Sequence, residues 1–426
     1  MSIKKCKGDA MFSSYDSATD ACRELLACLL NAPQRGAGGV AAESRLRRPF
    51  REELNTAFVL SNPRKRISQS LQLYPATARV IWMMAANNRL SDIKFHVPQV
   101  GNFTDDELTV PGSSYGMRLR QPQPGLDQIE GAIKRLKAET DSRRAAVTIF
   151  QPVDAIRESN DIPCAFGILF HNRDKFLETT VIMRSNNACA LLPFNLFEFS
   201  LLAEVVAVEA GLELGPITYF AGSMHLYESD IERAKGLLAE SVDTPFAMEQ
   251  MPCDKSPLKA LKRLAQADVK LREASTSLNI TMVNEIIADV ENDFGPYWSL
   301  FAKILACGVA ASRDFQTFSS LIQLIDPNLK RFLPKMSQNV ADINIAQIGG
   351  LFGRDVSSNV VVPIRRNNLM KRFAEHAVNY EAESGQAIGA AVLLRAQDLV
   401  FERFAARGDD DVLSYDAFRR ALDGQS

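Results

Sequence analysis

The fold is decided by four short segments of the sequence: DIPC at residues 161–164, MRSNN at 183–187, LPFN at 192–195 and GSMHLY at 222–227. Together they contain a thiol, an arginine followed by a serine, a carboxamide, and a histidine two positions before a tyrosine. A cation with a hydroxyl suits a phosphate group, an amide suits the edge of a base, and polar ring tips suit a ribose. The four segments therefore predict a nucleotide site in which the thiol is a candidate nucleophile.

The order and spacing of these segments resemble the thymidylate synthase family, which includes the pyrimidine nucleotide hydroxymethylases. The resemblance extends upstream to Ser114-Tyr115-Gly116 and Asp141-Ser142-Arg143-Arg144. It covers roughly the first 240 residues, which is the size of one domain. It implies an α/β (α+β) fold in which a thymidylate synthase-like mixed sheet is flanked by helices.

The resemblance also implies a role for each matching residue. These roles are catalysis for Cys164 and Tyr115, phosphate binding for Arg184, Ser185, Arg143 and Arg144, base binding for Asn195 and Asn187, and sugar binding for His225 and Tyr227. No residue is assigned to a metal, because the four histidines show no metal-ligand spacing.

The candidate nucleophile is Cys164, whose thiolate would attack C6 of the pyrimidine and so activate C5. A nearby arginine would lower the pKa of the thiol, and Arg184 is the expected neighbour. A buried, unreactive cysteine is the common alternative for a lone thiol. Tyr115 would assist proton abstraction, and the alternative is a core tyrosine with a satisfied hydroxyl.

The candidates for binding the base and the sugar are two asparagines and a histidine–tyrosine pair. Asn195 favours a uracil nucleotide, because related cytosine-nucleotide hydroxymethylases often carry aspartate at this place; an amide can flip, so cytosine stays open. Asn187 stands where the family has an aspartate that contacts the pterin and the water network. His225 and Tyr227 alternate onto one face of a predicted strand.

Three positions depart from the family pattern on the catalytic and cofactor side. Arg79 replaces a glutamate three residues before Trp82 that assists proton movements. An arginine stays charged, so it would bind an anion or form a salt bridge to a carboxylate. Ala165 replaces a histidine, and Leu191 replaces a glycine close to the ligand stack. Arg79, Asn187 and Leu191 together put ordinary folate chemistry in doubt, whereas the change at Ala165 is not disabling on its own.

Two arginine pairs are candidates for phosphate. Arg143 and Arg144 match a pair that crosses the dimer interface in the family to bind the partner's nucleotide, which implies a homodimer; surface charge is the alternative. Arg47 or Arg48 is the nearest match to an arginine of the first loop, and a solvated basic face is at least as good an interpretation.

Apolar residues recur at helical spacing through much of the chain. The predicted helices are 20–30, 76–86, 126–139, 196–211, a helix starting at Ser256-Pro257, 280–294, 297–311, 314–325, 369–380, 387–406 and 415–422. The predicted strands are 54–60, 145–150, 164–170 and 219–222. We expect a flexible leader at 1–18, a catalytic domain at 19–244 and an all-helical C-terminal region of unknown role at 245–426.

Composition limits the class of protein. The 426 residues are 46% hydrophobic and 23% charged, with a net charge of −2, which is ordinary for a globular protein and does not recruit nucleic acid or an anionic membrane. Seven scattered cysteines without a CxxC pair argue against a disulfide framework and favour a reducing cytoplasm. No apolar run is long enough to span a bilayer.

The sequence therefore predicts one-carbon transfer, either methylation or hydroxymethylation, to C5 of a pyrimidine nucleoside monophosphate such as dUMP. The resemblance implies 5,10-methylenetetrahydrofolate as the donor. One alternative is a nucleotide-binding or regulatory protein that has lost this chemistry. Another is a protein whose helical region binds a macromolecular partner.

Overall fold

A computed structural model describes residues 12–36, 48–242, 244–276, 278–311 and 313–334. Its strands are β1 (Ser13–Tyr15), β2 (Gln34–Arg35), β3 (Phe50–Leu60), β4 (Ala145–Thr148), β5 (Ala165–Arg173), β6 (Phe176–Met183), β7 (Asn186–Asn187) and β8 (Glu213–Tyr227). Its α-helices are α1 (Ala18–Leu29), α2 (Leu73–Met84), α3 (Leu90–Lys94), α4 (Tyr115–Arg120), α5 (Gln128–Ala138), α6 (Leu192–Ala210), α7 (Ile231–Ala239), α8 (Pro257–Glu273), α9 (Ile280–Phe294), α10 (Pro296–Ala311), α11 (Phe315–Gln323) and α12 (Pro327–Lys330). Short 3-10 turns lie at η1 (Pro98–Asn102), η2 (Pro152–Ala155), η3 (Glu228–Asp230) and η4 (Ala274–Thr276).

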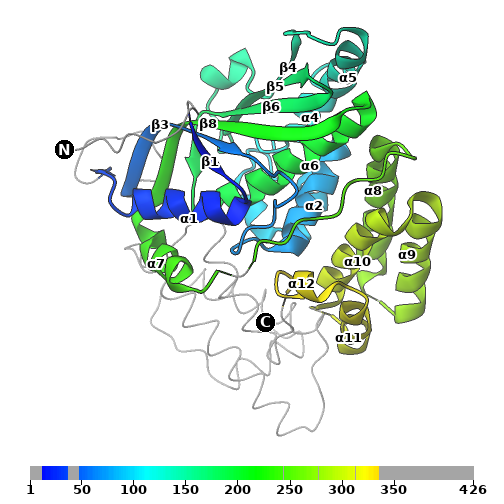
Figure 1. The fold of residues 1–426 in the computed structure, drawn as a ribbon. Helices are drawn as coiled ribbons and strands as arrows, with labels where there is room; N and C mark the ends of the chain where they lie inside the picture. Colours follow the sequence, from blue (N-terminus) through cyan, green and yellow to red (C-terminus); the bar gives the residue numbers. More distant parts are fainter. Residues whose placement is uncertain (1–11, 37–47, 243, 277, 312, 335–426) are drawn as a thin grey trace, which may run out of the picture. The chain divides into compact units, whose positions relative to one another are not determined.

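The strands form one mixed sheet, as predicted. Its order is β1-β3-β8-β6-β5-β4, and the short strands β2 and β7 pair with β3 and β8 (Figure 1). The β3–β8, β5–β6 and β4–β5 pairs are antiparallel, whereas β6–β8 and β1–β3 are parallel. The long central strand β8 therefore connects the two halves of the sheet.

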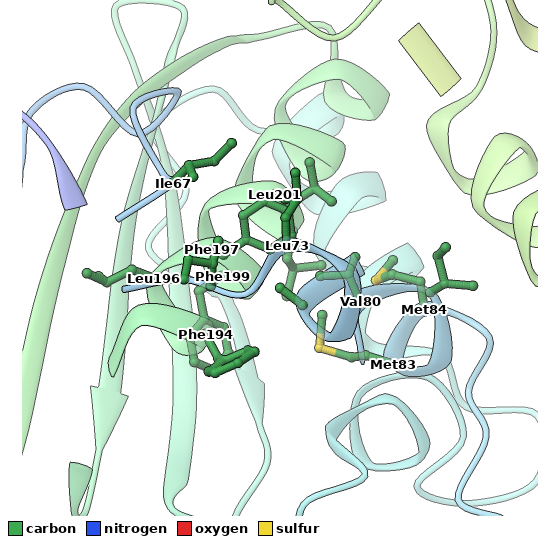
Figure 2. Packing of buried hydrophobic residues seen from close by; sticks show 14 of the residues in the cluster. Ile67, Leu73, Val80, Met83, Met84, Phe194, Leu196, Phe197, Phe199 and Leu201 are labelled. Carbon is green, nitrogen blue, oxygen red and sulfur yellow. The ribbon is translucent and has the colours of Figure 1, made fainter. Parts of the chain in front are cut away.

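Helices α1, α5 and α6 contact the sheet, and α6 contacts both of the others, so they lie on one face. Residues 192–207 of α6 are all buried, because this helix lies between the sheet and α2. Figure 2 shows Phe194, Phe197 and Phe199 of α6 in the same cluster as Val80 and Met83 of α2. Helix α6 ends at a glycine with φ of 77°, the left-handed cap that glycine adopts without strain.

The helices after residue 256 share the same hydrophobic core. Helix α8 begins as predicted, with the Ser256 hydroxyl accepting a hydrogen bond from the Lys259 N–H and proline at the first helical position. It contacts α2 and α6, and α10 also contacts α2. At that second contact a Cβ on Gly308 would lie 2.0 Å from the Tyr74 ring, so only glycine fits. The helices predicted at 369–380, 387–406 and 415–422 lie outside the described residues.

Candidate nucleotide site

The candidate nucleophile lies where three strands meet. Cys164 immediately precedes β5, and its carbonyl accepts a hydrogen bond of 2.8 Å from the Arg184 N–H, just after β6. The Arg184 carbonyl in turn accepts from the Ser223 N–H of β8 at 3.1 Å. The register of β5 and β6 shifts between Ala165 and Gly167, and such a bulge often re-aims side chains beside a site. The backbone therefore brings the DIPC, MRSNN and GSMHLY segments together, as predicted.

Arg184 holds the loop that carries the thiol. Its Nε donates to the Pro163 carbonyl at 2.8 Å, and its Nη2 donates to the Ile162 carbonyl at 2.9 Å and lies 4.0 Å from the Cys164 Sγ. The predicted neighbourhood of thiol and guanidinium is thus confirmed. Burial raises the pKa of the Cys164 thiol, and Arg184 lowers it, as predicted, but by less, so the pKa stays above its ordinary value.

The two sugar-binding candidates lie side by side, as their alternation predicts. The rings of His225 and Tyr227 are T-shaped with centroids 5.1 Å apart, and Phe50 of β3 packs edge-on against both. The Ser185 hydroxyl lies 3.3 Å from the His225 Nδ1. Burial lowers the pKa of His225 to about 4, so its imidazole is neutral at pH 7.

A basic residue lies beside this ring pair. The Arg48 guanidinium is 5.5 Å from the Tyr227 ring centroid, which places a cation near the phosphate-binding candidates. Arg48 also lowers the pKa of Tyr227, although burial raises that pKa more. Arg47, the other candidate from the first loop, lies outside the described residues.

A chain of buried amides supports the base-binding candidate Asn195. Its Nδ2 donates to the Asn186 Oδ1 at 3.1 Å, and the Asn186 Nδ2 donates to the Tyr219 hydroxyl at 2.6 Å. All three side chains are buried. The Asn195 side chain is also hydrogen-bonded to the Tyr219 hydroxyl, so the amide that would contact the base is held in place by two buried partners.

Asn187 has a different local role. Its Oδ1 accepts hydrogen bonds from the N–H groups of Cys189 and Ala190, both at 2.9 Å, and its side chain is buried. The oxygen that could contact a ligand is therefore engaged in the turn before α6. Cys189 is buried too, as expected for a packing residue.

Tyr115 lies at the start of α4, buried against α6. Its ring stacks on Phe199 with centroids 5.9 Å apart, and the charges of Cys164 and Glu198 help to raise the pKa of its hydroxyl after burial has raised it most. The next residue must be glycine, because a Cβ on Gly116 would lie 1.8 Å from the Met83 carbonyl oxygen of α2. The sequence SYG therefore fixes the tyrosine between α2, α6 and the thiol.

Arg79 of α2 forms the salt bridge that its sequence position suggested as one outcome. Its partner is Glu198 of α6, which receives hydrogen bonds from the Arg79 Nε and, at 3.3 Å, from Nη2. The side chain of Glu198 is 2% exposed and that of Arg79 is 13% exposed. The guanidinium also lies over the Phe194 ring, 5.6 Å from its centroid.

Asp161 organises the loop before the thiol. Its carboxylate accepts hydrogen bonds from the N–H groups of Gly112 and Ser113, at 2.7 and 2.6 Å, and from the Ser113 hydroxyl at 2.5 Å. A Cβ on Gly112 would lie 2.1 Å from the Asp161 carbonyl oxygen, so the two loops touch backbone to backbone. This contact ties residues 97–113 to the DIPC segment.

The arginine pair Arg143 and Arg144 is exposed and lies away from the thiol. The pair precedes β4, whose first residue pairs with Phe170 at the far part of β5. Cys164 precedes the opposite end of that strand, six residues back. At about 3.3 Å per residue the two ends are about 20 Å apart. Within one chain, these arginines therefore do not join the site around Cys164.

The remaining departures are accommodated without strain. Leu191 is half-buried at the N-cap of α6 with φ of −112°, a conformation that does not require glycine. Ala165 is fully buried at the start of β5.

Three residues of this site were not assigned a role by sequence: Asp161, Asn186 and Glu198. Asn186 and Glu198 form long-range side-chain contacts that no local pattern predicts. One signal for Glu198 was available, since a charged residue interrupts an otherwise apolar helix one turn after Asn195.

In the part of the chain that the structure describes, no group of three or more His, Cys, Asp or Glu side chains could hold a metal ion. No helix among these residues has the length and apolar character needed to cross a bilayer.

The chain is similar to known proteins over much of this region. The family model described as thymidylate synthase matches residues 39–284. A protein of Methanosarcina mazei and one of Methanothermobacter marburgensis are each named "Putative thymidylate synthase". The first is 38% identical over 138 residues, 32% of this chain and 60% of that protein; the second is 32% identical over 194 residues, 44% of this chain and 82% of that protein. A "Thymidylate synthase" of Buchnera aphidicola is 26% identical over 198 residues, 45% of this chain and 74% of that protein.

Proposed function

The chain belongs to the thymidylate synthase family, and on that premise we propose that it transfers a one-carbon unit to C5 of a pyrimidine nucleoside monophosphate, such as dUMP. The observation that carries the proposal is the convergence of a thiol, a cation and a neutral histidine at Cys164, Arg184 and His225, with Asn195 behind them. Arg184, His225 and Asn195 match the phosphate, the sugar and the base of a nucleotide, and the thiol supplies the nucleophile.

The phosphate and sugar would be bound by groups with unused hydrogen-bonding capacity. The Arg184 Nη1 makes no hydrogen bond to any described residue, so this donor can meet a phosphate oxygen. The Ser185 hydroxyl is next to it in sequence. A neutral His225 can hydrogen-bond a sugar hydroxyl through Nε2 while its Nδ1 faces Ser185.

The thiol would activate C5 by adding to C6. The Cys164 thiolate forms the S–C6 bond, and the C5=C6 electron pair moves through C4 onto the base oxygen. C5 then forms a bond to an electrophile, either the one-carbon unit or a solvent proton. Loss of the original C5 proton to a base and expulsion of the thiolate from C6 restore the C5=C6 double bond. After burial, the charge of Cys164 contributes to the raised pKa of the Tyr115 hydroxyl, so the two groups lie near one another, which supports the proton role inferred for Tyr115.

The one-carbon donor is a separate part of the proposal. The family generally uses methylenetetrahydrofolate. Here the Asn187 oxygen is engaged in a turn and Leu191 occupies the place of a glycine, so these two positions do not supply the expected pterin contacts. We therefore derive only the C5 activation from the structure and propose the folate donor as a component to be tested.

A homodimer is supported by two observations. Arg143 and Arg144 lie about 20 Å along β5 from the thiol of their own chain. If they bind a substrate phosphate, it would therefore be the phosphate in the site of a partner subunit. In addition, outward-facing residues of the sheet, such as Phe166 and Phe176, are about half exposed on the face opposite α6. An apolar sheet face of this kind suits a second copy of the chain.

The test is release of tritium from C5-labelled dUMP, UMP, dCMP and CMP, with and without methylenetetrahydrofolate, by the wild-type protein and by Cys164→Ala. We expect release from a uracil nucleotide that Cys164→Ala abolishes. The nucleotide preference would name the base and sugar, and a folate requirement would name the donor. Measurable nucleotide binding without any release would refute the transferase proposal.

That last outcome would favour a second candidate, a nucleotide-binding protein without the chemistry. The Arg79–Glu198 salt bridge is the observation that favours it, because a charged arginine cannot relay a proton.

The domain division is likewise a proposal, with residues 19–244 as the catalytic domain and 245–426 as a helical addition. Since α8 packs on α2 and α6, removing the addition would expose apolar surface, and point variants are the sounder test.

A further inference from the structure

The Arg79–Glu198 pair lies beside the groups that would bind and activate the base. Glu198 is three residues after Asn195, so the two side chains share one face of α6. Arg79 lies over the ring of Phe194, the residue immediately before Asn195. The pair therefore lies next to the amide that would contact the base.

The pair also lies on the side of the thiol. The charges of both Arg79 and Glu198 reach Tyr115, which the Cys164 charge reaches as well. Arg79 and Cys164 thus both lie within electrostatic range of Tyr115, and Asn195 lies one helical turn from the partner of Arg79.

The two members of the pair differ in their accessibility. The Glu198 side chain is only 2% exposed to solvent, whereas the Arg79 side chain is 13% exposed. Arg79 donates to Glu198 through Nε and Nη2, and its Nη1 makes no hydrogen bond to any described residue. The Glu198 carboxylate therefore fixes the position of the guanidinium and leaves the Arg79 Nη1 as a donor for a ligand.

We propose that Arg79 is a catalytic residue, and that its guanidinium, held by Glu198, stabilises the negative charge that develops on the base oxygen when Cys164 adds to C6. This inference rests on the proposed function and adds a residue to it. In the addition, the thiolate pair forms the S–C6 bond and the C5=C6 pair moves onto the oxygen at C4. A solvent proton then adds at C5, the original C5 hydrogen leaves as a proton, and the thiolate is expelled. The step involves no oxidation or reduction.

A fixed cation in a site of restricted solvent access suits this task. A donor that is held in place before the reaction needs no reorganisation as charge develops, and removing one such donor typically lowers kcat about 100- to 1000-fold. Glu198 would be a positioning residue, because it acts on the base only through Arg79.

The experiment measures kcat for C5-tritium release, the Kd of dUMP and the midpoint of thermal unfolding in three variants. Arg79→Gln removes the charge, Arg79→Lys keeps it, and the double variant Arg79→Gln/Glu198→Gln replaces the salt bridge by a neutral pair that leaves no buried carboxylate unpaired. Arg263→Gln is the control, because it removes an arginine that bridges Asp289 and Asp293 at the surface of α8.

We expect kcat to fall about 100-fold or more in Arg79→Gln, with the Kd of dUMP changed less than about tenfold. Arg79→Lys should recover part of the loss, because a lysine keeps the charge without the planar fork. The neutral pair should unfold close to the wild-type temperature and yet release tritium as slowly as Arg79→Gln. Arg263→Gln should release tritium at the wild-type rate.

Recovery of release in the neutral pair would overturn the inference, since the loss in Arg79→Gln would then come from the unpaired Glu198 carboxylate and not from the missing cation. A loss confined to dUMP affinity would overturn it as well, because the cation would then bind substrate without favouring the transition state. If the wild-type protein releases no tritium from any of the four nucleotides, the proposed function fails and this role fails with it.

Discussion

The hydroxyl of Tyr219 is expected to stabilise the protein through the amide chain that it ends. In Tyr219→Phe the Asn186 Nδ2 loses its acceptor, which lies 2.6 Å away. Both side chains are buried, at 0% and 1% exposure, so water cannot replace the lost partner. Leaving a buried donor unpaired costs about 1–3 kcal/mol. We therefore expect the free energy of unfolding to fall by that amount.

Tyr297 offers a matched control. It is also buried, at 7% exposure, but its hydroxyl has no hydrogen-bond partner among the described residues. Tyr297→Phe removes the same atom without breaking a bond and relieves a buried, unpaired polar group. The free energy of unfolding should stay unchanged or rise by up to about 1 kcal/mol.

Urea-induced unfolding of the wild type and both variants measures the difference directly. The Tyr219→Phe variant should also discriminate less well between dUMP and dCMP in kcat/KM, because Asn195 would lose the chain that fixes the orientation of its amide. Equal stability of the two variants would show that the amide chain contributes nothing and would refute the reasoning.

Three further predictions concern single residues. Asn195→Asp should shift the kcat/KM preference from dUMP toward dCMP by at least about tenfold, because a carboxylate cannot donate to a uracil oxygen; an unchanged preference would mean that Asn195 does not contact the base. Burial lowers the pKa of His225 to about 4 from an ordinary 6.5, so the contribution of the neutral form to stability is fully present above pH 6.5. This contribution, about 3 kcal/mol, is lost as the pH falls toward 4, and His225→Gln should flatten the pH dependence of the urea midpoint in that range. Gly116→Ala should lower the free energy of unfolding by about 3 kcal/mol or more, because its Cβ would collide with the Met83 carbonyl, whereas Gly131→Ala, in α5 with open space around it, should raise it by about 1 kcal/mol.

Periodicity predicted the long helices well, because each presents an apolar face at regular spacing. Helix α9 matches its predicted bounds, and α8 begins at the predicted serine cap. Strand β6 was not predicted, although it lies in the centre of the sheet. The turn before it is formed by Asp174 and Lys175, both with positive φ, and a turn of this kind without glycine gives a weak sequence signal.

The candidate site was predictable where its residues lie in compact segments. Cys164, Arg184, His225 and Tyr227 meet because neighbouring strands deliver them to one end of the sheet. The thiol pKa was not predictable, since sequence shows the neighbouring charge but not the burial that outweighs it. The partner of Arg79 was hidden for a similar reason: Glu198 is 119 residues away in the chain.

The bonds from Arg184 to the carbonyls of Ile162 and Pro163 make the nucleophile's loop depend on the side chain proposed to bind phosphate. A phosphate that fixes the position of this guanidinium would also fix the backbone of the loop that carries the Cys164 thiol. Part of the energy of binding a remote, unreactive group would thus be spent on aligning the sulfur with C6. A nucleoside that lacks the phosphate would then show a lower kcat as well as a weaker affinity. The protein would therefore distinguish a nucleotide from its nucleoside by the rate of reaction as well as by binding.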